Sequence, residues 1–137
     1  MAKGNEVNLA QFRIEQAREC LDIAEKTVDS SLKNSVNRSY YCIFHAMRAV
    51  LALDKYDSKK HSGIISEFRQ QYIKTGVFPK HFSDIIRKAF QIRNESDYED
   101  FYMVAESEAR KQIKNAKEFL EAVEKHIATI IEENQRT

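Results

Sequence analysis

The sequence predicts an all-α protein, an up-and-down bundle of four to five helices, and three observations lead to this class. The 137 residues include only 3 glycines and 1 proline, whereas β and α/β folds need many turns that use these two residues. Hydrophobic residues make up 42% of the chain and charged residues 31%, which is a globular composition rather than a disordered one. Apolar residues also recur every three or four positions, as they do on one face of a helix. We expect a single domain over residues 1–137, with a core at about residues 7–131 and frayed termini.

The first two predicted helices are long and amphipathic. The first covers residues 7–29, and its apolar stripe consists of Leu9, Phe12, Ala17, Cys20, Leu21, Ala24 and Val28. Serine and asparagine in "DSSLKNS" can cap the helix that follows. That second helix covers residues 35–53, and its wide apolar face consists of Val36, Tyr40, Ile43, Phe44, Met47, Val50 and Leu51. Because small and aromatic residues also flank this face, we expect the second helix to be central and to contact several others.

Two shorter helices and one long helix complete the predicted bundle. The third starts near Ser62 and ends before Gly76, which can adopt the left-handed conformation that ends helices. The fourth has Pro79 in its first turn, where a missing amide proton costs nothing, and ends at Asn94. Their inward residues are Ile64, Ile65, Phe68 and Tyr72, then Phe82, Ile85, Ile86, Ala89 and Phe90.

The fifth predicted helix covers residues 103–133 and carries a heptad-like apolar seam. The seam consists of Ala109, Ile113, Ala116, Leu120, Val123, Ile127 and Ile130. Alternating spacings of four and three suit packing along another long helix at a shallow angle. The partner is either the first two helices of the same chain or a second copy, and we favour the internal contact.

Composition and charge argue against several classes of function. The net charge is +1, so a strongly basic nucleic-acid clamp is not indicated. No apolar run approaches the roughly 20 residues that span a membrane, and the N-terminal residues lack the apolar core of a signal peptide. Cys20 and Cys42 lie on apolar stripes, so we expect buried thiols in a reducing compartment rather than a disulfide. No metal-site spacing and no glycine-rich phosphate loop is present. We therefore expect a cytoplasmic protein with no metal, no cofactor and no membrane attachment.

The second predicted helix also carries a polar strip. Asn37, Tyr41, His45 and Arg48 lie three or four residues apart, so they share one helix face. A polar strip beside an apolar face on a central helix can line a ligand-binding cleft. The alternative is that Tyr41 and His45 lie at the edge of the core, each with one hydrogen bond, and that Arg48 is solvated. On these residues alone we favour the alternative.

A second polar candidate is the stretch "QIRNESDYEDFY", residues 91–102. We expect Arg93 and Asn94 to end the fourth helix. Asp97 and Asp100 are expected near the start of the fifth, where carboxylates suit the helix dipole and capping. In this arrangement Asp97 is the N-cap, and Arg93 pairs with it across the turn. Because Arg93 directly follows the apolar part of the fourth helix, it lies close to the core and needs a carboxylate partner or an anionic ligand.

Three segments of the chain together resemble HEPN domains. They are "NRSYYCIFHAMRAVLAL", "KKHSGIISEF" and "TGVFPKHFSDIIRKAFQIRNESDYEDF". The sequence is similar to the small stand-alone HEPN proteins with an Arg…Asp-Tyr motif, the UPF0332 type, over about residues 9–127. The resemblance implies a four- to five-helix bundle that is usually a homodimer and is often encoded beside a minimal nucleotidyltransferase. Many HEPN domains are metal-independent RNases that act as toxins or defence effectors, whereas others only bind or scaffold partners.

The RNase branch of this family uses an arginine, a polar residue and then a histidine. Arg93 and Asn94 match the first two positions, but Tyr98 stands where the first allowed histidine belongs. Tyrosine has an ordinary pKa of about 10, so it is a poorer acid–base group at neutral pH. Asp97 would be a base only with a raised pKa, and a neighbouring Arg93 lowers the pKa instead. His45 is a replacement proton carrier only if the second helix faces Arg93.

The resemblance and the missing histidine lead to two hypotheses of function. The first, which we favour, is a HEPN binding or partner module that holds a nucleotide, RNA or a nucleotidyltransferase partner in a dimer cleft. Its ligand-binding residues are predicted to be Asn37, Tyr41, His45, Arg48 and Asn94, beside Arg93, Asp97 and Tyr98. The alternative is a metal-independent endoribonuclease toxin of a toxin–antitoxin or defence system, with Arg93, Asp97 and Tyr98 as the candidate catalytic residues of a degenerate motif.

Two further interpretations concern the same stretch. In toxin–antitoxin members of the family, the nucleotidyltransferase modifies a tyrosine near the motif, and Tyr98 or Tyr102 is the candidate in this chain. A purely structural interpretation is that Arg93, Asp97 and Tyr98 only lock two helices together.

Overall fold

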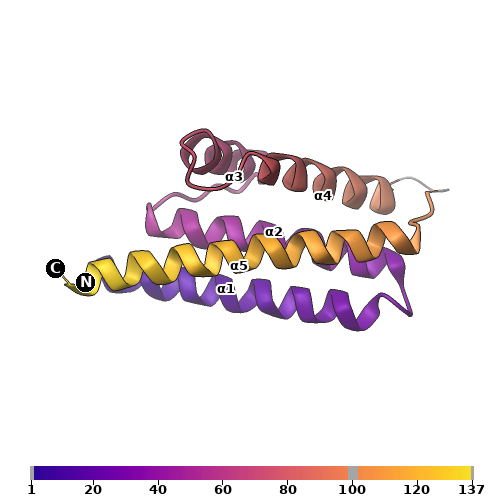
Figure 1. Ribbon diagram of the computed structural model, residues 1–137, viewed down its shortest axis with the longest axis horizontal. Helices are drawn as coiled ribbons and strands as arrows, with labels where there is room; N and C mark the ends of the chain where they lie inside the picture. The colour runs from indigo at the N-terminus through magenta and orange to yellow at the C-terminus, as the bar shows by residue number, and fades with distance from the viewer. Residues whose placement is uncertain (1, 99–101, 137) are drawn as a thin grey trace.

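The predicted all-α class is confirmed by a computed structural model that describes residues 2–98 and 102–136 (Figure 1). The described residues form five α-helices and one π-helical segment, and they contain no β-strand. The elements are α1 (Ala2–Thr27), α2 (Leu32–Leu53), α3 (His61–Phe68), η1 (Arg69–Ile73), α4 (His81–Tyr98) and α5 (Glu106–Arg136).

The long helices alternate in direction, as predicted for an up-and-down bundle. α1, α2 and α5 lie side by side along the long axis of the molecule, and the two ends of the chain lie at the same end of the bundle (Figure 1). α3 and α4 form a second layer over α2, on the side away from α1 (Figure 1). α2 contacts α1, α3, α4 and α5, which confirms its predicted central position.

The sequence of α2 explains why other helices can surround it. All of its predicted apolar positions are buried, namely Val36, Tyr40, Ile43, Phe44, Met47, Val50 and Leu51. Small residues such as Ser39, Ala46 and Ala49 are completely buried as well, so neighbouring helices can approach closely. Ser31 caps the first turn by accepting a 3.2 Å hydrogen bond from the Asn34 amide.

The apolar seam of α5 packs inside the chain, as favoured from the sequence. α5 lies against α1, α2 and α4. Ala109, Ala116, Leu120, Val123 and Ile127 are buried, whereas Ile113 and Ile130 are half-buried. Phe119, which the seam omitted, is fully buried and stacks on Phe82 with 4.8 Å between ring centroids. Such aromatic pairs add stability beyond the area they bury.

Part of the predicted apolar stripe of α1 was wrong. Leu9 is 41% exposed and Phe12 is 60% exposed. The buried face of this half of the helix instead contains Ala10, Ile14 and Ala17. α1 packs closely along α2, and small alanines allow this closer approach, which rotates the larger Leu9 and Phe12 outward.

The two end helices reach the limits of the described residues, and the expected fraying of the termini stays a prediction. α1 begins at Ala2, and an ion pair of 3.4 Å joins Glu6 to Lys55 at the end of α2. α5 continues to Arg136, whose guanidinium lies 2.7 Å from Glu132 one turn earlier. Such pairs at four-residue spacing support a helix end by a few tenths of a kcal/mol. α5 also begins at Glu106 rather than at Met103, because Glu106 and Glu108 place negative charge in its first turn.

Two loop predictions had different outcomes. Gly76 has a φ of 83° after η1, which confirms the predicted left-handed helix end. Pro79 lies before α4 rather than in its first turn. The amides of Phe82 and Ser83 donate 3.0 Å hydrogen bonds to the carbonyls three residues earlier, those of Pro79 and Lys80. The chain therefore enters α4 through a tighter turn.

Cys20 and Cys42 are free and buried, as predicted. Burial raises the pKa of both thiols, which keeps them protonated at neutral pH. None of the helices in the described part of the chain is long and apolar enough to cross a membrane. Over residues 2–98 and 102–136, no cluster of histidine, cysteine, aspartate and glutamate side chains is placed to hold a metal ion.

Candidate functional site

Arg93 lies near the end of α4, where this helix packs against α2, and its side chain is 16% exposed. Nη2 donates a 3.1 Å hydrogen bond to the Tyr41 hydroxyl of α2. Nε lies 3.1 Å from Asp97 Oδ2, but the N–H does not point at this oxygen, so the contact is an ion pair rather than an aligned hydrogen bond. Nη1 makes a longer contact of 3.4 Å with Asn94 Oδ1. Contacts from two helices therefore fix the guanidinium.

Asp97 lies on the same helix as Arg93, so the prediction that it caps α5 was wrong. α4 continues four residues beyond Asn94, and Ser96 within this extension is buried. The predicted pairing of Arg93 with Asp97 is present, but it connects successive turns of one helix rather than two helices. Asn37 of α2 donates a weak 3.5 Å hydrogen bond to Asp97 Oδ2.

Asp100, which was predicted beside Asp97 at the start of the fifth helix, lies outside the described residues.

An aromatic platform supports Arg93, and we define it as Tyr40, Tyr41, Phe44 and His61. The guanidinium carbon lies 5.4 Å from the ring centroids of both Tyr40 and Tyr41. The His61 ring stacks on Phe44 with 4.0 Å between centroids. Cation–π contacts of this kind attract the guanidinium to the ring faces, and they add to the hydrogen bond that Arg93 donates to Tyr41. We call Arg93, Asp97, Asn37, Asn94 and this platform the Arg93 cluster.

His61 is the functional candidate that sequence reasoning missed. It begins α3, and its Nδ1 lies 2.7 Å from the Tyr40 hydroxyl. Burial raises the pKa of Tyr40, so this hydroxyl keeps its proton and donates it to Nδ1. Burial also lowers the pKa of His61, and the charges of Arg93 and Arg48 lower it further. Neutral His61 in this arrangement carries its own proton on Nε2. A histidine thus lies within electrostatic reach of Arg93.

The predicted polar strip of α2 is divided between two clusters. Asn37 and Tyr41 contact α4, as described above. Arg48 instead pairs with Asp57 of the following loop at 3.2 Å. Arg13 of α1 joins this second cluster, with 3.4 Å to Asp57 and a 3.1 Å hydrogen bond to the Arg48 carbonyl. Arg48 is therefore paired with a carboxylate rather than free in solvent, and this partner directs it away from Arg93.

His45 lies between these two clusters. Its ring centroid is 6.0 Å from that of Tyr41, and its Nδ1 is buried with no hydrogen-bond partner among the described residues. Burial lowers the pKa of His45 to about 4, and the nearby charges of Arg48, Arg13 and Arg38 contribute. His45 is consequently neutral at physiological pH, and it contacts the platform rather than the guanidinium of Arg93.

Tyr98 is the candidate that the structure separates from the others. Its side chain is 74% exposed at the end of α4. Asn94, one turn earlier, is half-buried and contacts Arg93. The aromatic ring that replaces the motif histidine in the sequence therefore points to solvent instead of packing beside Arg93.

The Arg93 cluster has the chemistry of a preformed anion site. A guanidinium carries five N–H donors, and the hydrogen bonds above engage one on Nη1 and one on Nη2, whereas the Nε contact with Asp97 is an ion pair. Each terminal nitrogen keeps a second N–H, and guanidinium N–H groups are donors that bind phosphate or carboxylate. Because the guanidinium is already fixed, little conformational entropy is lost when an anion binds.

Comparisons with known proteins agree with this architecture. The sequence profile described as the HEPN domain matches residues 10–126. A UPF0332 protein of Thermotoga maritima is 34% identical, with 82% of this chain and 86% of that protein covered. Two proteins of Methanocaldococcus jannaschii are also similar. "Putative toxin MJ0605" is 31% identical over 88% of this chain and 90% of its own length, and "Putative toxin MJ0142" is 28% identical over 83% and 78%.

Proposed function

The chain belongs to the HEPN domain family, and on that premise we propose that it is a binding module whose Arg93 cluster holds a phosphate group of RNA or of a nucleotide. We further propose that it acts as a homodimer and together with a nucleotidyltransferase partner. The observation that carries the proposal is the fixed guanidinium of Arg93, which keeps one N–H on each terminal nitrogen beyond its contacts with Tyr41 and Asn94.

The surrounding charges favour an anion over a cation. Arg38 lies over the Tyr41 ring at 5.5 Å from its centroid, and Arg93 lies over the same ring. Asp97 is the carboxylate that contacts this part of the site. Two guanidinium groups around one carboxylate leave a local excess of positive charge, although the net charge of the whole chain is only +1. Exposed Tyr98, one turn beyond Asn94, offers a ring face on which a base can stack.

The direct test is binding of a fluorescein-labelled single-stranded RNA and of AMP, followed by fluorescence anisotropy and calorimetry. We expect Arg93→Ala to weaken RNA binding by about tenfold or more, because a hydrogen bond to a charged group contributes about 1.5–3 kcal/mol. The matched control is Arg136→Ala at the far end of the bundle, where Arg136 pairs with Glu132. Equal affinities of the wild type and Arg93→Ala would rule out the proposed site.

The partner and dimer parts of the proposal need their own experiments. Sedimentation equilibrium of the purified chain should give the mass of a dimer. Co-purification with a nucleotidyltransferase encoded beside the gene should recover a stable complex. A monomer that recovers no such partner would limit the proposal to ligand binding alone.

A second candidate function is a metal-independent endoribonuclease toxin, and His61 is the observation that favours it. In such a reaction Arg93 would stabilise charge on the scissile phosphate, and His61 would transfer a proton between the ribose hydroxyl and the leaving oxygen. The relatives named as toxins in Methanocaldococcus jannaschii are consistent with this function. This candidate replaces the missing motif histidine with one from α3.

The endoribonuclease candidate makes separate predictions. Expression should arrest growth, and the purified chain should cleave RNA in EDTA. Both effects should disappear in Arg93→Ala and in His61→Ala, but not in the control His81→Ala, because His81 is exposed and pairs with Glu118. Intact RNA and harmless expression would exclude this function.

A further inference from the structure

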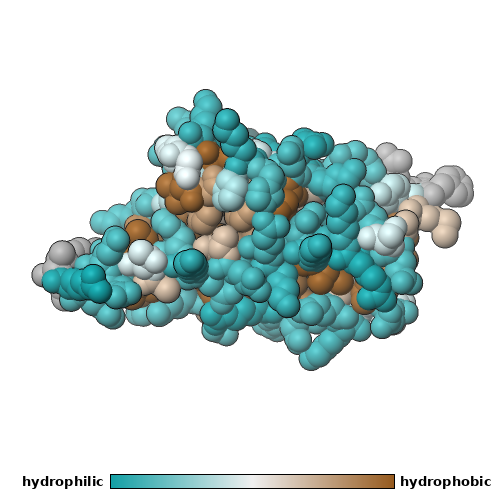
Figure 2. All heavy atoms as spheres, viewed as in Figure 1, coloured by the Kyte–Doolittle hydropathy of each residue, from teal (hydrophilic) through white to brown (hydrophobic). Residues whose placement is uncertain are grey.

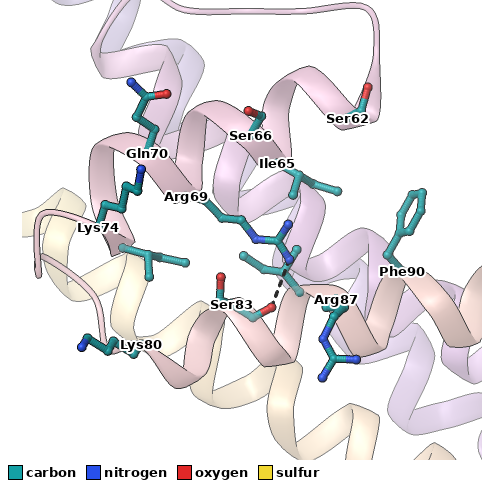
Figure 3. Close-up of a pocket in the computed structure, with 12 residues that line it drawn as sticks. Ser62, Ile65, Ser66, Arg69, Gln70, Lys74, Lys80, Ser83, Arg87 and Phe90 are labelled. Atoms are coloured by element: carbon teal, nitrogen blue, oxygen red, sulfur yellow. Dashed lines mark hydrogen bonds between the residues drawn. The ribbon is translucent and has the colours of Figure 1, made fainter.

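A separate pocket of about 780 Å³ lies between the α3–η1 segment and α4. Its apolar lining consists of Ile65, Ile73, Ile86 and Phe90 (Figure 3). Figure 2 shows hydrophobic atoms reaching the surface over α3 and the start of α4, within a mostly hydrophilic face. The volume lies in the range of about 300–1,000 Å³ that is typical of small-molecule sites.

The polar lining of this pocket is basic. Arg69, Lys74, Lys80 and Arg87 line it together with Ser62, Ser66, Ser83 and Gln70, and no aspartate or glutamate is among the lining residues. Arg87 has a carboxylate partner outside the pocket, Asp84, at 3.5 Å. The pocket thus combines an apolar floor with an uncompensated positive charge, which favours a ligand that is apolar in one part and anionic in another.

Arg69 is the central cation of the pocket. It is half-buried and reaches from η1 toward α4, where Nη2 donates a 3.2 Å hydrogen bond to the Ser83 carbonyl (Figure 3). Its Nε is buried and has no hydrogen-bond partner among the described residues. Apart from Arg38, every other arginine in residues 2–98 and 102–136 lies within 4.0 Å of a carboxylate. A half-buried guanidinium with free donors and no carboxylate is a binding group for an anion.

The backbone that carries Arg69 is itself unusual. η1 is a π-helical turn, in which the Lys74 amide bonds to the Arg69 carbonyl at 2.9 Å. Single π-turns are less favourable than α-helix and occur frequently at functional sites. This turn places Arg69, Ile73 and Lys74 on the same wall of the pocket.

We propose that this pocket binds a small organic anion with a flat apolar body. Arg69 holds the anionic group through its unpaired N–H donors, and Ile65, Ile86 and Phe90 contact the body. A nucleoside monophosphate and an aromatic carboxylate share this chemistry. The site does not depend on the function proposed for Arg93, although Phe90 lies one turn before Arg93 and its ring is 5.9 Å from that of Tyr40.

The test is nuclear magnetic resonance of the full chain with labelled isoleucine methyl groups. The probes are AMP, indole-3-acetate and 1-anilinonaphthalene-8-sulfonate, each titrated to about millimolar concentration, a range that detects even weak binding. Supporting results are shifts at Ile65, Ile73 and Ile86 without shifts at Ile127 on the opposite side of the core. A response to AMP alone assigns a nucleoside phosphate, and a response to indole-3-acetate alone assigns an aromatic carboxylate. No shift at these methyl groups with any probe would overturn the proposal.

Variants separate this site from the Arg93 cluster. Arg69→Met keeps the length of the side chain and should weaken probe binding by about tenfold or more, whereas Arg69→Lys should be intermediate because it keeps the charge but loses the fork. Arg110→Met, on an exposed arginine of α5, is the matched control and should bind like the wild type. Arg93→Ala should retain the methyl shifts at Ile65, Ile73 and Ile86, which report on the pocket alone, whereas it should lose AMP binding at the Arg93 cluster. Unchanged affinity in both Arg69 variants would refute the assignment of the anionic group.

Discussion

Replacing Asp97 by asparagine tests whether Arg93 is a binding group or only a structural lock. The substitution keeps the shape of the side chain and removes its charge. The side chains of Arg93 and Asp97 are 16% and 24% exposed, with 3.1 Å between Nε and Oδ2. Breaking a fully buried pair costs about 3–5 kcal/mol, whereas exposed pairs contribute about 0.2–1 kcal/mol. Because the site is partly exposed and Tyr41 still holds Arg93, we expect a loss of about 1–2 kcal/mol in the free energy of unfolding.

The same substitution should affect ligand binding in the opposite direction. Without the carboxylate, the charge of Arg93 is compensated less, so we expect RNA affinity to rise about threefold to tenfold, equivalent to about 1 kcal/mol. The chain has no tryptophan, so unfolding in urea is best followed by far-ultraviolet circular dichroism, and binding by anisotropy of labelled RNA. A change of stability and affinity in opposite directions is the signature of a guanidinium that is shared between a carboxylate and a ligand.

The matched control is Asp84→Asn on the same helix. Asp84 and Arg87 are 75% and 61% exposed and 3.5 Å apart, so this change should cost less than about 0.5 kcal/mol and leave RNA affinity unaltered. If Asp97→Asn is no more destabilising than Asp84→Asn, the estimate of the pair's strength is wrong. If Asp97→Asn destabilises but RNA affinity stays constant, Arg93 is a lock and not a binding group.

Three further predictions concern stability. His45 has a pKa of about 4 in the folded chain and about 6.5 in the unfolded chain. Between these two values the unfolded chain binds one more proton, so the free energy of unfolding falls as the pH falls from about 6.5 to about 4. We expect this decrease to be about 1–2 kcal/mol, allowing for partial exposure. The midpoint of urea unfolding should fall between about pH 7 and pH 5, and His45→Gln should make this dependence on pH weaker. An equal pH dependence in the wild type and the variant would contradict the assignment to His45. Phe119→Ala should cost about 3–5 kcal/mol because Phe119 is fully buried, and a urea midpoint close to that of the wild type would refute this. Lys55 has a φ of 62°, so Lys55→Gly should stabilise by about 0.5–1 kcal/mol although its partly exposed ion pair with Glu6 is lost; a lower melting temperature would show the opposite.

Helix periodicity predicted the core because the buried face of a helix is set by apolar residues three or four positions apart in the sequence. The apolar face of α2 is buried at every predicted position, and the seam of α5 packs internally. The error at Leu9 and Phe12 has a physical origin in the same interface. Periodicity weighs large apolar residues most strongly, whereas the close contact of α1 with α2 favours small residues such as Ala10 and Ala17. The identity of the partner helix decides which stripe is buried, and one sequence does not reveal it.

The candidate site was predicted only in part because its geometry depends on where helices end and how loops turn. The pairing of Arg93 with Asp97 was predicted, but a turn was assumed where α4 continues to Tyr98 with Ser96 buried. His61 was not selected because its position beside Tyr40 depends on the path of the loop between α2 and α3. Arg69 was missed for a related reason, since no sequence pattern indicates the π-helical turn that carries it.

The two proposed sites lie along one ridge of α4. Ser83, Ile86 and Phe90 line the pocket, and Arg93 and Asp97 continue the same row at spacings of three and four residues. Seven residues separate Ile86 from Arg93, which is about 10 Å along a helix, so a change at one site can reach the other through side chains of a single rigid element. Their charge states differ, however, because Asp97 offsets Arg93, whereas Arg69 on the opposite wall of the pocket has no ion pair with a carboxylate of residues 2–98 and 102–136. A freely diffusing anion should therefore occupy the pocket before it competes with Asp97 for Arg93. Binding at the Arg93 cluster is then expected to require a ligand that makes additional contacts, which RNA, a nucleotide that stacks on Tyr98 or a protein partner can supply.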